Sequence, residues 1–176
     1  MVATMRPLTR DEVRAAIANT DPGERVRLPT WFDEVTWDRI DYLAWRDPRA
    51  PVRAYLVTDI DGTALGALLR QCPSQPALAS RALMCDLCRA TRRFNEVSLF
   101  TARRPAKDKR HRLSTRGLHL CTDLDCHTTV TTPPPTGPHD PPAADVIAAR
   151  REGLRARTAA FLCSITDTRR PTTRRR

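Results

Sequence analysis

Four cysteines in two close pairs constrain this chain more than any other feature of its sequence. The first pair is Cys85 and Cys88, the second is Cys121 and Cys126, and 32 residues separate the pairs. Zinc takes tetrahedral ligands in structural sites, and thiolate sulfurs bind it at about 2.3 Å. If the intervening segment brings the pairs together, they supply a complete ligand set. We therefore predict that Cys85, Cys88, Cys121 and Cys126 bind a structural Zn²⁺.

The segment between the two pairs has the pattern of a β-hairpin. Residues 96–103 alternate with a period near two, which indicates a strand. Residues 104–114 are polar and basic, as expected for a loop, and residues 116–121 are expected to form the returning strand. A cysteine knuckle, a hairpin and a second pair that runs into a turn or helix is the order of elements in a treble-clef finger.

Two other roles for this cluster are open. A thioredoxin-like redox motif lies at the start of a helix within βαβ repeats, and no such repeat surrounds Cys85. His119 and His127 lie near the second pair and are alternative ligands, although the four cysteines already complete the set.

Four thiolates would leave no position for water on the metal, which argues against metal-dependent hydrolysis. The sequence also has no P-loop, no glycine-rich dinucleotide turn and no Ser-His-Asp spacing, so we expect no enzyme activity.

Local patterns predict both helices and strands in the rest of the chain. Thr9 and Glu12 fit a capping box, which predicts a short helix over residues 10–18. An Asp-Gly turn at Asp61 lies between two β-prone runs, which predicts a hairpin. Apolar residues recur at helical spacing over residues 143–164 and predict a helix.

Three further expectations concern less regular segments. Residues 40–44 are expected to form a single helical turn, and residues 128–142, rich in Thr and Pro, to lack regular structure. On the helix over residues 143–164, Arg151 and Arg155 are expected to face solvent, whereas Arg157 lies nearer the apolar side.

Together these patterns predict one α+β domain over residues 5–165. It has a small antiparallel sheet, a four-cysteine treble-clef zinc finger and a C-terminal helix. Residues 166–176, which are rich in arginine, are expected to form a disordered basic tail.

Positive charge is concentrated in two parts of the chain. Residues 1–84 carry eleven basic and eleven acidic side chains. Residues 89–116 carry ten basic and two acidic side chains, and residues 167–176 carry five basic and one acidic. The basic hairpin between Arg89 and Arg116 is therefore suited either to RNA phosphates or to an acidic protein surface, where charge steers association.

The sequence also bears on the cellular compartment. No apolar run approaches the roughly 20 residues needed to cross a bilayer, and we expect no membrane partner. The first residues lack the apolar core of a signal peptide. We therefore expect a cytoplasmic protein, whose thiols stay reduced.

Several segments resemble the treble-clef zinc-finger domain of the elongation factor G-binding proteins, the family that includes fusidic-acid resistance proteins. The segments that carry the resemblance are residues 5–9, 45–48, 53–57, 84–88, 97–104, 121–126 and 154–162. The run from Val97 to Arg104 together with the two cysteine pairs is the most specific of them.

The resemblance implies a zinc-bearing domain that binds the translocation factor on the ribosome, with the four cysteines as zinc ligands. From charge and expected exposure we place the partner contact at Phe100, Arg103 and Arg104, and we expect a monomer. The alternative function is that of a zinc-finger RNA-binding protein, which would use the basic hairpin between Arg89 and Arg116.

Overall fold

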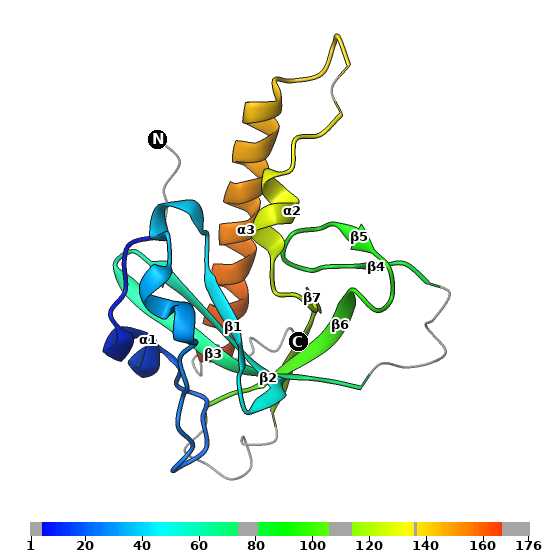
Figure 1. Cartoon of the computed structure of the whole chain (residues 1–176). Coiled ribbons are helices and arrows are strands. Elements are labelled where there is room, and N and C mark those ends of the chain that lie inside the picture. The colour runs from blue at the N-terminus through cyan, green and yellow to red at the C-terminus, as the bar shows by residue number, and fades with distance from the viewer. Residues whose placement is uncertain (1–4, 74–80, 106–113, 136, 167–176) are drawn as a thin grey trace, which may run out of the picture.

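The computed structural model describes residues 5–73, 81–105, 114–135 and 137–166. The predicted tail and most of the predicted basic loop lie outside these residues. The helices and strands, in chain order, are α1 (Arg10–Ala16), η1 (Thr30–Glu34), η2 (Trp37–Arg39), β1 (Leu43–Asp47), β2 (Ala50–Ile60), β3 (Thr63–Gln71), β4 (Leu83–Met84), β5 (Thr91–Arg92), β6 (Val97–Arg103), β7 (Thr115–Cys121), α2 (Cys126–Thr131) and α3 (Ala143–Thr166). Figure 1 shows their arrangement.

Five strands form one antiparallel sheet in the order β1-β2-β3-β6-β7, and β4 pairs with β5 in a separate two-stranded ribbon. The predicted hairpin at Asp61 is the β2–β3 connection. Asp61 and Gly62 both have positive φ, 50° and 82°, as a tight two-residue turn between twisted strands requires. The α+β fold class predicted from the sequence is confirmed.

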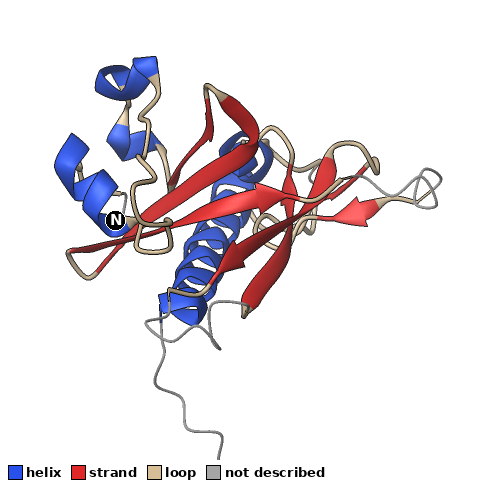
Figure 2. Ribbon diagram, turned by 90° about the horizontal axis from the view of Figure 1, so that it is seen from below, coloured by secondary structure: helices blue, strands red, loops and turns tan. Residues whose placement is uncertain are grey.

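The sheet is buried on both faces, because apolar side chains occupy successive positions of its central strands. Ala54 and Leu56 of β2 belong to a core that includes residues of α3 and the four cysteines. Tyr55 and Val57 point the opposite way, into a second core formed with the N-terminal segment. Figure 2 shows the result, with α3 crossing one face of the sheet and the short N-terminal helices gathered on the other side.

The N-terminal helix begins where the sequence predicts and ends two residues earlier. The Thr9 hydroxyl accepts a hydrogen bond from the Glu12 backbone N–H at 3.2 Å, and the Glu12 carboxylate accepts one from the Thr9 backbone N–H at 2.7 Å. This capping box satisfies two amides that a helix start leaves without partners. Val13 is fully buried and anchors the helix in the second core.

The C-terminal helix is also confirmed, but two of its arginines lie differently from expectation. Arg151 and Arg155 do not face solvent. Their guanidinium groups donate hydrogen bonds to the carboxylate of Asp41, at 3.0 Å and 2.7 Å, and the Asp41 side chain is completely buried. Because Asp41 comes from the segment before β1, this network ties the last helix to the first strand.

Two other local expectations are wrong. Residues 43–47 form strand β1 instead of a helical turn, and Leu43, Trp45 and Asp47 alternate toward the interior. Tertiary pairing with β2 overrides the weak helical spacing there. The Thr-rich stretch after Cys126 is the short helix α2, because the Asp125 side chain accepts a hydrogen bond from the Thr128 backbone N–H and caps it.

The Asp41 network predicts a large effect of one substitution. Asp41→Ala leaves the guanidinium groups of Arg151 and Arg155 half-buried without a carboxylate, so we expect a loss of about 3–5 kcal/mol in the free energy of unfolding. Denaturant-induced unfolding measures this loss. The matched control is Asp38→Ala, which removes an exposed carboxylate that forms no ion pair with the described residues. Equal, small effects of both substitutions would contradict the prediction.

Candidate metal centre

Two loops bring the four thiols together from segments far apart in the sequence. Cys85 and Cys88 lie in a tight turn between β4 and β5. Cys121 ends β7, and Cys126 is the first residue of α2. The four sulfur atoms lie within 4.8 Å of one another, with 3.7 Å between the sulfurs of Cys85 and Cys126 and between those of Cys88 and Cys121.

These distances fit a zinc ion. Four ligands at about 2.3 Å in a tetrahedron are separated from each other by about 3.8 Å, close to the two shortest sulfur–sulfur distances here. All four cysteines are buried, so the cluster is shielded from water. Soft thiolate donors in this number and geometry are what a structural Zn²⁺ site contains. The predicted set of Cys85, Cys88, Cys121 and Cys126 is therefore positioned to hold Zn²⁺.

The electrostatics of the thiols explain why such a cluster needs a cation. Hydrogen bonding with the Cys121 thiol lowers the pKa of Cys85 and of Cys88, and the Ala90 backbone N–H lowers the pKa of Cys88 further. Hydrogen bonding with Cys121 and Cys85 raises the pKa of Cys126. Without a dication, the four buried thiols therefore oppose complete deprotonation, whereas a bound metal favours four thiolates.

The backbone of each loop is shaped by hydrogen bonds to the rest of the domain. The Asp86 carboxylate accepts a hydrogen bond from the His119 backbone N–H at 2.6 Å, and the Asp86 N–H donates to the His119 carbonyl at 2.8 Å. These contacts fix the first loop against β7. Arg89 and Leu124, one in each loop, adopt positive φ of 62° and 61°, so both loops turn sharply next to their cysteines.

Tyr42 braces the second loop and was not predicted from the sequence. Its hydroxyl donates to the Leu124 carbonyl at 3.0 Å and accepts from the Cys126 backbone N–H at 3.2 Å. Burial raises the pKa of Tyr42 well above its ordinary value, so the hydroxyl keeps its proton for this role. No local motif surrounds Tyr42, and its position relative to Cys126 depends on the tertiary fold.

Arg157 braces the first loop. Its Nε donates to the Leu87 carbonyl at 2.6 Å, between the two cysteines of the first pair. The sequence places Arg157 near the apolar side of its helix. An arginine at such a position indicates that its guanidinium has a partner inside the protein. The positive charge also lies close to the thiols of the cluster.

Neither histidine near the second pair belongs to the ligand set. His127 packs against Tyr42, with its Nε2 3.0 Å from the Tyr42 carbonyl oxygen and its Nδ1 accepting a hydrogen bond from the Asp41 backbone N–H. The His119 Nδ1 lies 3.9 Å from the Asp86 carboxylate. The His127 ring is thus engaged with other groups, and the four cysteines form the cluster without either histidine, as the four-cysteine prediction expects.

The expected exposure of Phe100 is wrong. Phe100 is completely buried in the core between the sheet and α3, and the guanidinium of Arg46 covers its ring at 5.5 Å. Strand parity explains the error, since residues 100 and 103 of β6 point to opposite faces and only one of them can meet solvent. Leu99, on the same face as Arg103, is the exposed apolar residue of this strand.

Arg103 and Arg104 differ from each other. Arg103 is exposed, and its guanidinium donates to the Asp21 carboxylate at 3.0 Å. Arg104 is half-buried, and its backbone N–H donates to the Ser114 carbonyl. Lys107, Lys109, Arg110 and Arg112 of the predicted basic hairpin lie outside the described residues.

A knuckle, a β-hairpin and a second cysteine pair at the start of a short helix define a treble-clef zinc-finger protein. Comparison with protein families agrees, because the family described as FBP C-terminal treble-clef zinc-finger matches residues 12–165. The chain belongs to this family. No curated protein and no solved structure matches the chain.

No helix among the described residues is long and apolar enough to cross a membrane. This finding agrees with the hydropathy of the sequence.

The geometry predicts that Cys85→Ser abolishes stoichiometric zinc binding and causes a sharp fall in the melting temperature. Metal binding contributes directly to folding in sites of this kind, and a serine hydroxyl does not replace a thiolate. Zinc content by elemental analysis and thermal unfolding measure the two effects. The control is Cys163→Ser, which changes an exposed cysteine outside the cluster and should alter neither. Unchanged zinc content and melting in Cys85→Ser would refute the assignment.

Proposed function

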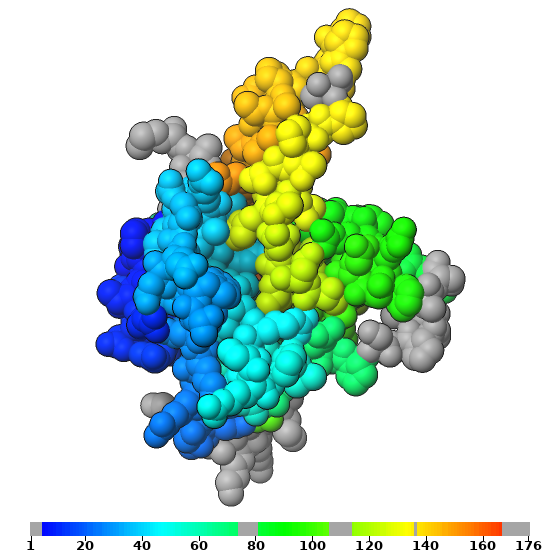
Figure 3. Space-filling model, viewed as in Figure 1, coloured from blue at the N-terminus to red at the C-terminus, as the bar shows by residue number. Residues whose placement is uncertain are grey.

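We propose that this protein is a non-enzymatic zinc-binding protein that binds elongation factor G on or near the ribosome. The observation that carries the proposal, besides the family membership, is a groove beside the zinc site. We call it the knuckle groove. It has a volume of about 650 Å³ and lies between the first cysteine loop, α2 and the first turns of α3. In Figure 3 the β4–β5 ribbon in green and α2 in yellow lie side by side on one face of the molecule.

The knuckle groove has an apolar centre and a basic rim. Small apolar side chains form its centre, and three guanidinium groups surround it. The apolar residues are Ala90, Val130, Val146 and Ala149, and the arginines are Arg89, Arg150 and Arg157. One exposed carboxylate, Asp145, also lies in the lining, so the rim carries a net positive charge of two. Protein interfaces typically combine an apolar core with a polar rim in which arginine is common. This composition supports a protein partner with an acidic border around an apolar contact.

The groove also moves the proposed contact surface away from Phe100. Because Phe100 is buried, it contacts no partner in this fold, and Arg103 and Arg104 lie on the far end of the β6–β7 hairpin from the cysteine loops. The zinc site would then support the interface, because it would fix the first cysteine loop at the edge of the knuckle groove.

The non-enzymatic part of the proposal rests on the ligand set. Four thiolates would fill the coordination shell of zinc and leave no open position for a substrate or an activated water. The metal then acts as a structural cross-link. We propose that the protein works as a monomer in the cytoplasm, through contact alone.

The competing function is RNA binding through the basic hairpin. The two differ in their response to salt, because phosphate contacts release counterions and weaken steeply as salt rises. A protein interface with an apolar centre weakens less.

The test is a titration of the zinc-loaded full chain against purified elongation factor G at low and moderate salt, with ribosomal RNA as competitor. We expect binding that persists at moderate salt and in the presence of RNA. Ala149→Glu places a carboxylate in the knuckle groove and should weaken binding at least tenfold, because it fills the apolar centre, neutralises part of the basic rim and repels an acidic partner.

The matched control is Ala160→Glu, which adds the same carboxylate at an exposed position of the same helix outside the groove. It should bind like the unaltered protein, and both variants should melt alike. Equal binding by the two variants would remove the groove from the proposal. Binding to RNA alone, fading with salt, would refute the factor-binding function.

A further inference from the structure

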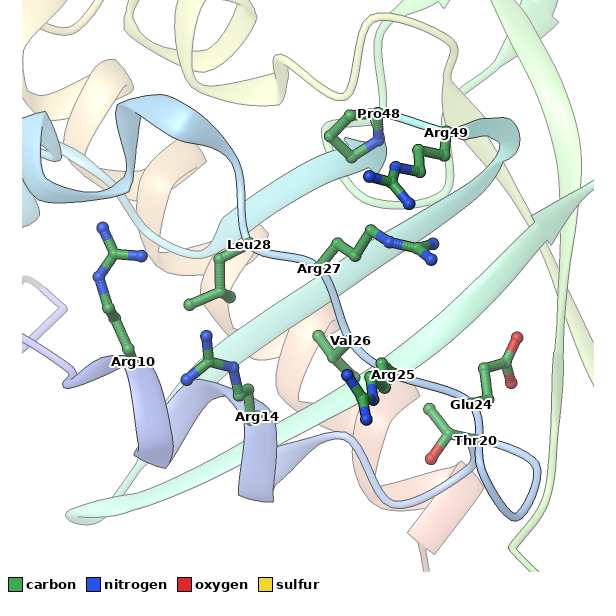
Figure 4. Close-up of a pocket in the computed structure, with 10 residues that line it drawn as sticks. All are labelled: Arg10, Arg14, Thr20, Glu24, Arg25, Val26, Arg27, Leu28, Pro48 and Arg49. Atoms are coloured by element: carbon green, nitrogen blue, oxygen red, sulfur yellow. The ribbon is translucent and has the colours of Figure 1, made fainter.

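A second concave site lies on the opposite side of the sheet from the zinc centre. It is a cleft of about 850 Å³ between α1, the extended segment over residues 24–28 and the β1–β2 turn. Figure 4 shows the ten residues that line it. Five of them are arginines, namely Arg10, Arg14, Arg25, Arg27 and Arg49. We call this site the arginine cleft.

Local structure places these arginines in two rows. Arg10 and Arg14 are four residues apart in α1 and therefore share one face of the helix. Arg25 and Arg27 alternate along an extended segment with Val26 and Leu28, which are half-buried, so both arginines are exposed. In Figure 4, Arg10 and Arg14 rise from α1 on one side of this segment, and Arg49 lies on its other side.

The five arginines differ in whether they already form ion pairs with carboxylates of the protein. Arg25 and Arg49 are exposed and form no ion pair with the described residues. Arg10 and Arg14 pair with Asp33 and Asp11.

Both of these pairs are open to solvent, since the Asp33 and Asp11 side chains are 71% and 95% exposed. The Arg14–Asp11 pair is a single exposed contact, which contributes little and exchanges readily for another anion. The Arg10 guanidinium donates two parallel hydrogen bonds to Asp33 and lies over the Phe32 ring, so Arg10 is held more firmly. Arg27 is also held more firmly, with its guanidinium 3.5 Å from the buried carboxylate of Asp47. Among the described residues, the cleft thus offers two unpaired cations, one exchangeable cation and two that are held more firmly.

The acidic residue of the lining does not cancel this charge. Glu24 is the one acidic lining residue among those described, and its carboxylate lies 2.5 Å from the guanidinium of Arg53 and 3.8 Å from that of Arg70. The field of the cleft is therefore positive because Arg25 and Arg49 have no carboxylate partner among the described residues, although residues 1–84 as a whole carry equal numbers of basic and acidic side chains. A cleft of one charge sign concentrates the opposite ion from solution.

The rest of the lining indicates which anion fits. The centre of a protein interface is mainly apolar, whereas half of this lining is arginine and only three of its ten residues are apolar. Guanidinium groups bind phosphate through two parallel hydrogen bonds. The lining contains no aromatic side chain on which a base would stack. The lining therefore suits the phosphates of a nucleic acid strand and offers no group that would recognise the bases.

We propose that the arginine cleft binds the phosphate backbone of single-stranded RNA without sequence preference. Arg25 and Arg49 make the primary contacts, and Arg14 exchanges its exposed aspartate for a phosphate. This site is separate from the knuckle groove and is independent of the proposed binding of elongation factor G.

The test measures binding of a fluorescently labelled oligouridylate to the zinc-loaded full chain over a series of salt concentrations. On a logarithmic plot of affinity against salt, each neutralised phosphate of a single strand contributes a slope of about −0.7. The double variant Arg25→Ala/Arg49→Ala removes two contacts. We expect its affinity at low salt to fall at least tenfold and the slope to become shallower by about 1.4. Because both side chains are exposed and unpaired among the described residues, the melting temperature should stay unchanged.

The matched control is Arg81→Ala/Arg93→Ala, which removes the same charge from two exposed arginines beside the β4–β5 ribbon. It should keep the slope of the unaltered protein. An unchanged slope in the Arg25/Arg49 variant, or the same change in both double variants, would overturn the proposal. The second outcome would assign RNA binding to the basic hairpin, which contains Arg93, or to the general charge of the protein.

Two competitors separate RNA from other anions. Inorganic triphosphate that displaces the RNA at equal phosphate concentration would overturn the proposal in favour of a small polyphosphate ligand. A labelled polyglutamate peptide that binds through Arg25 and Arg49, when the oligouridylate does not, would overturn it in favour of an acidic protein segment. We expect that inorganic triphosphate and polyglutamate each compete only weakly with the oligouridylate for the arginine cleft.

Discussion

The convergence of four thiols on one point is the constraint on which this fold depends. The two cysteine pairs are held by short loops, each with a residue at positive φ and with one buried leucine, Leu87 or Leu124, that packs into the core. A metal bound by both loops joins them and turns the hairpin between them into a rigid unit. The surrounding domain adds direct supports, since the Tyr42 hydroxyl holds the second loop and the Arg157 guanidinium holds the first.

A buried ionic network joins the N-terminal and C-terminal parts of the domain. Asp41 precedes the first strand, and Arg151 and Arg155 lie on the last helix, so their hydrogen bonds close the domain across its whole length. Ionic contacts of this kind add less net stability than apolar packing would, but they are intolerant of losing one partner. Because His127 packs against both Asp41 and Tyr42, this network lies directly against the second cysteine loop.

The sheet separates two surfaces of different chemistry. On the α3 side, the knuckle groove has an apolar centre with arginines at its rim, which suits a protein partner. On the α1 side, the arginine cleft is lined mainly by guanidinium groups, which suit phosphates. Under the functions proposed above, the two sites would let the protein contact a factor and RNA with opposite faces.

Local chemistry in the sequence determined the zinc ligands, the capping box at Thr9, the turn at Asp61 and the long last helix, because each depends on residues close together or on a fixed spacing. Tertiary structure alone decided which side of a strand faces water, so Phe100 is buried although the equally apolar Leu99 beside it is exposed. It also decided the partners of Arg151 and Arg155, since the buried Asp41 carboxylate lies more than a hundred residues away. Long-range contacts of this kind leave no local pattern, because the residues that satisfy each other are set by how the sheet and α3 pack.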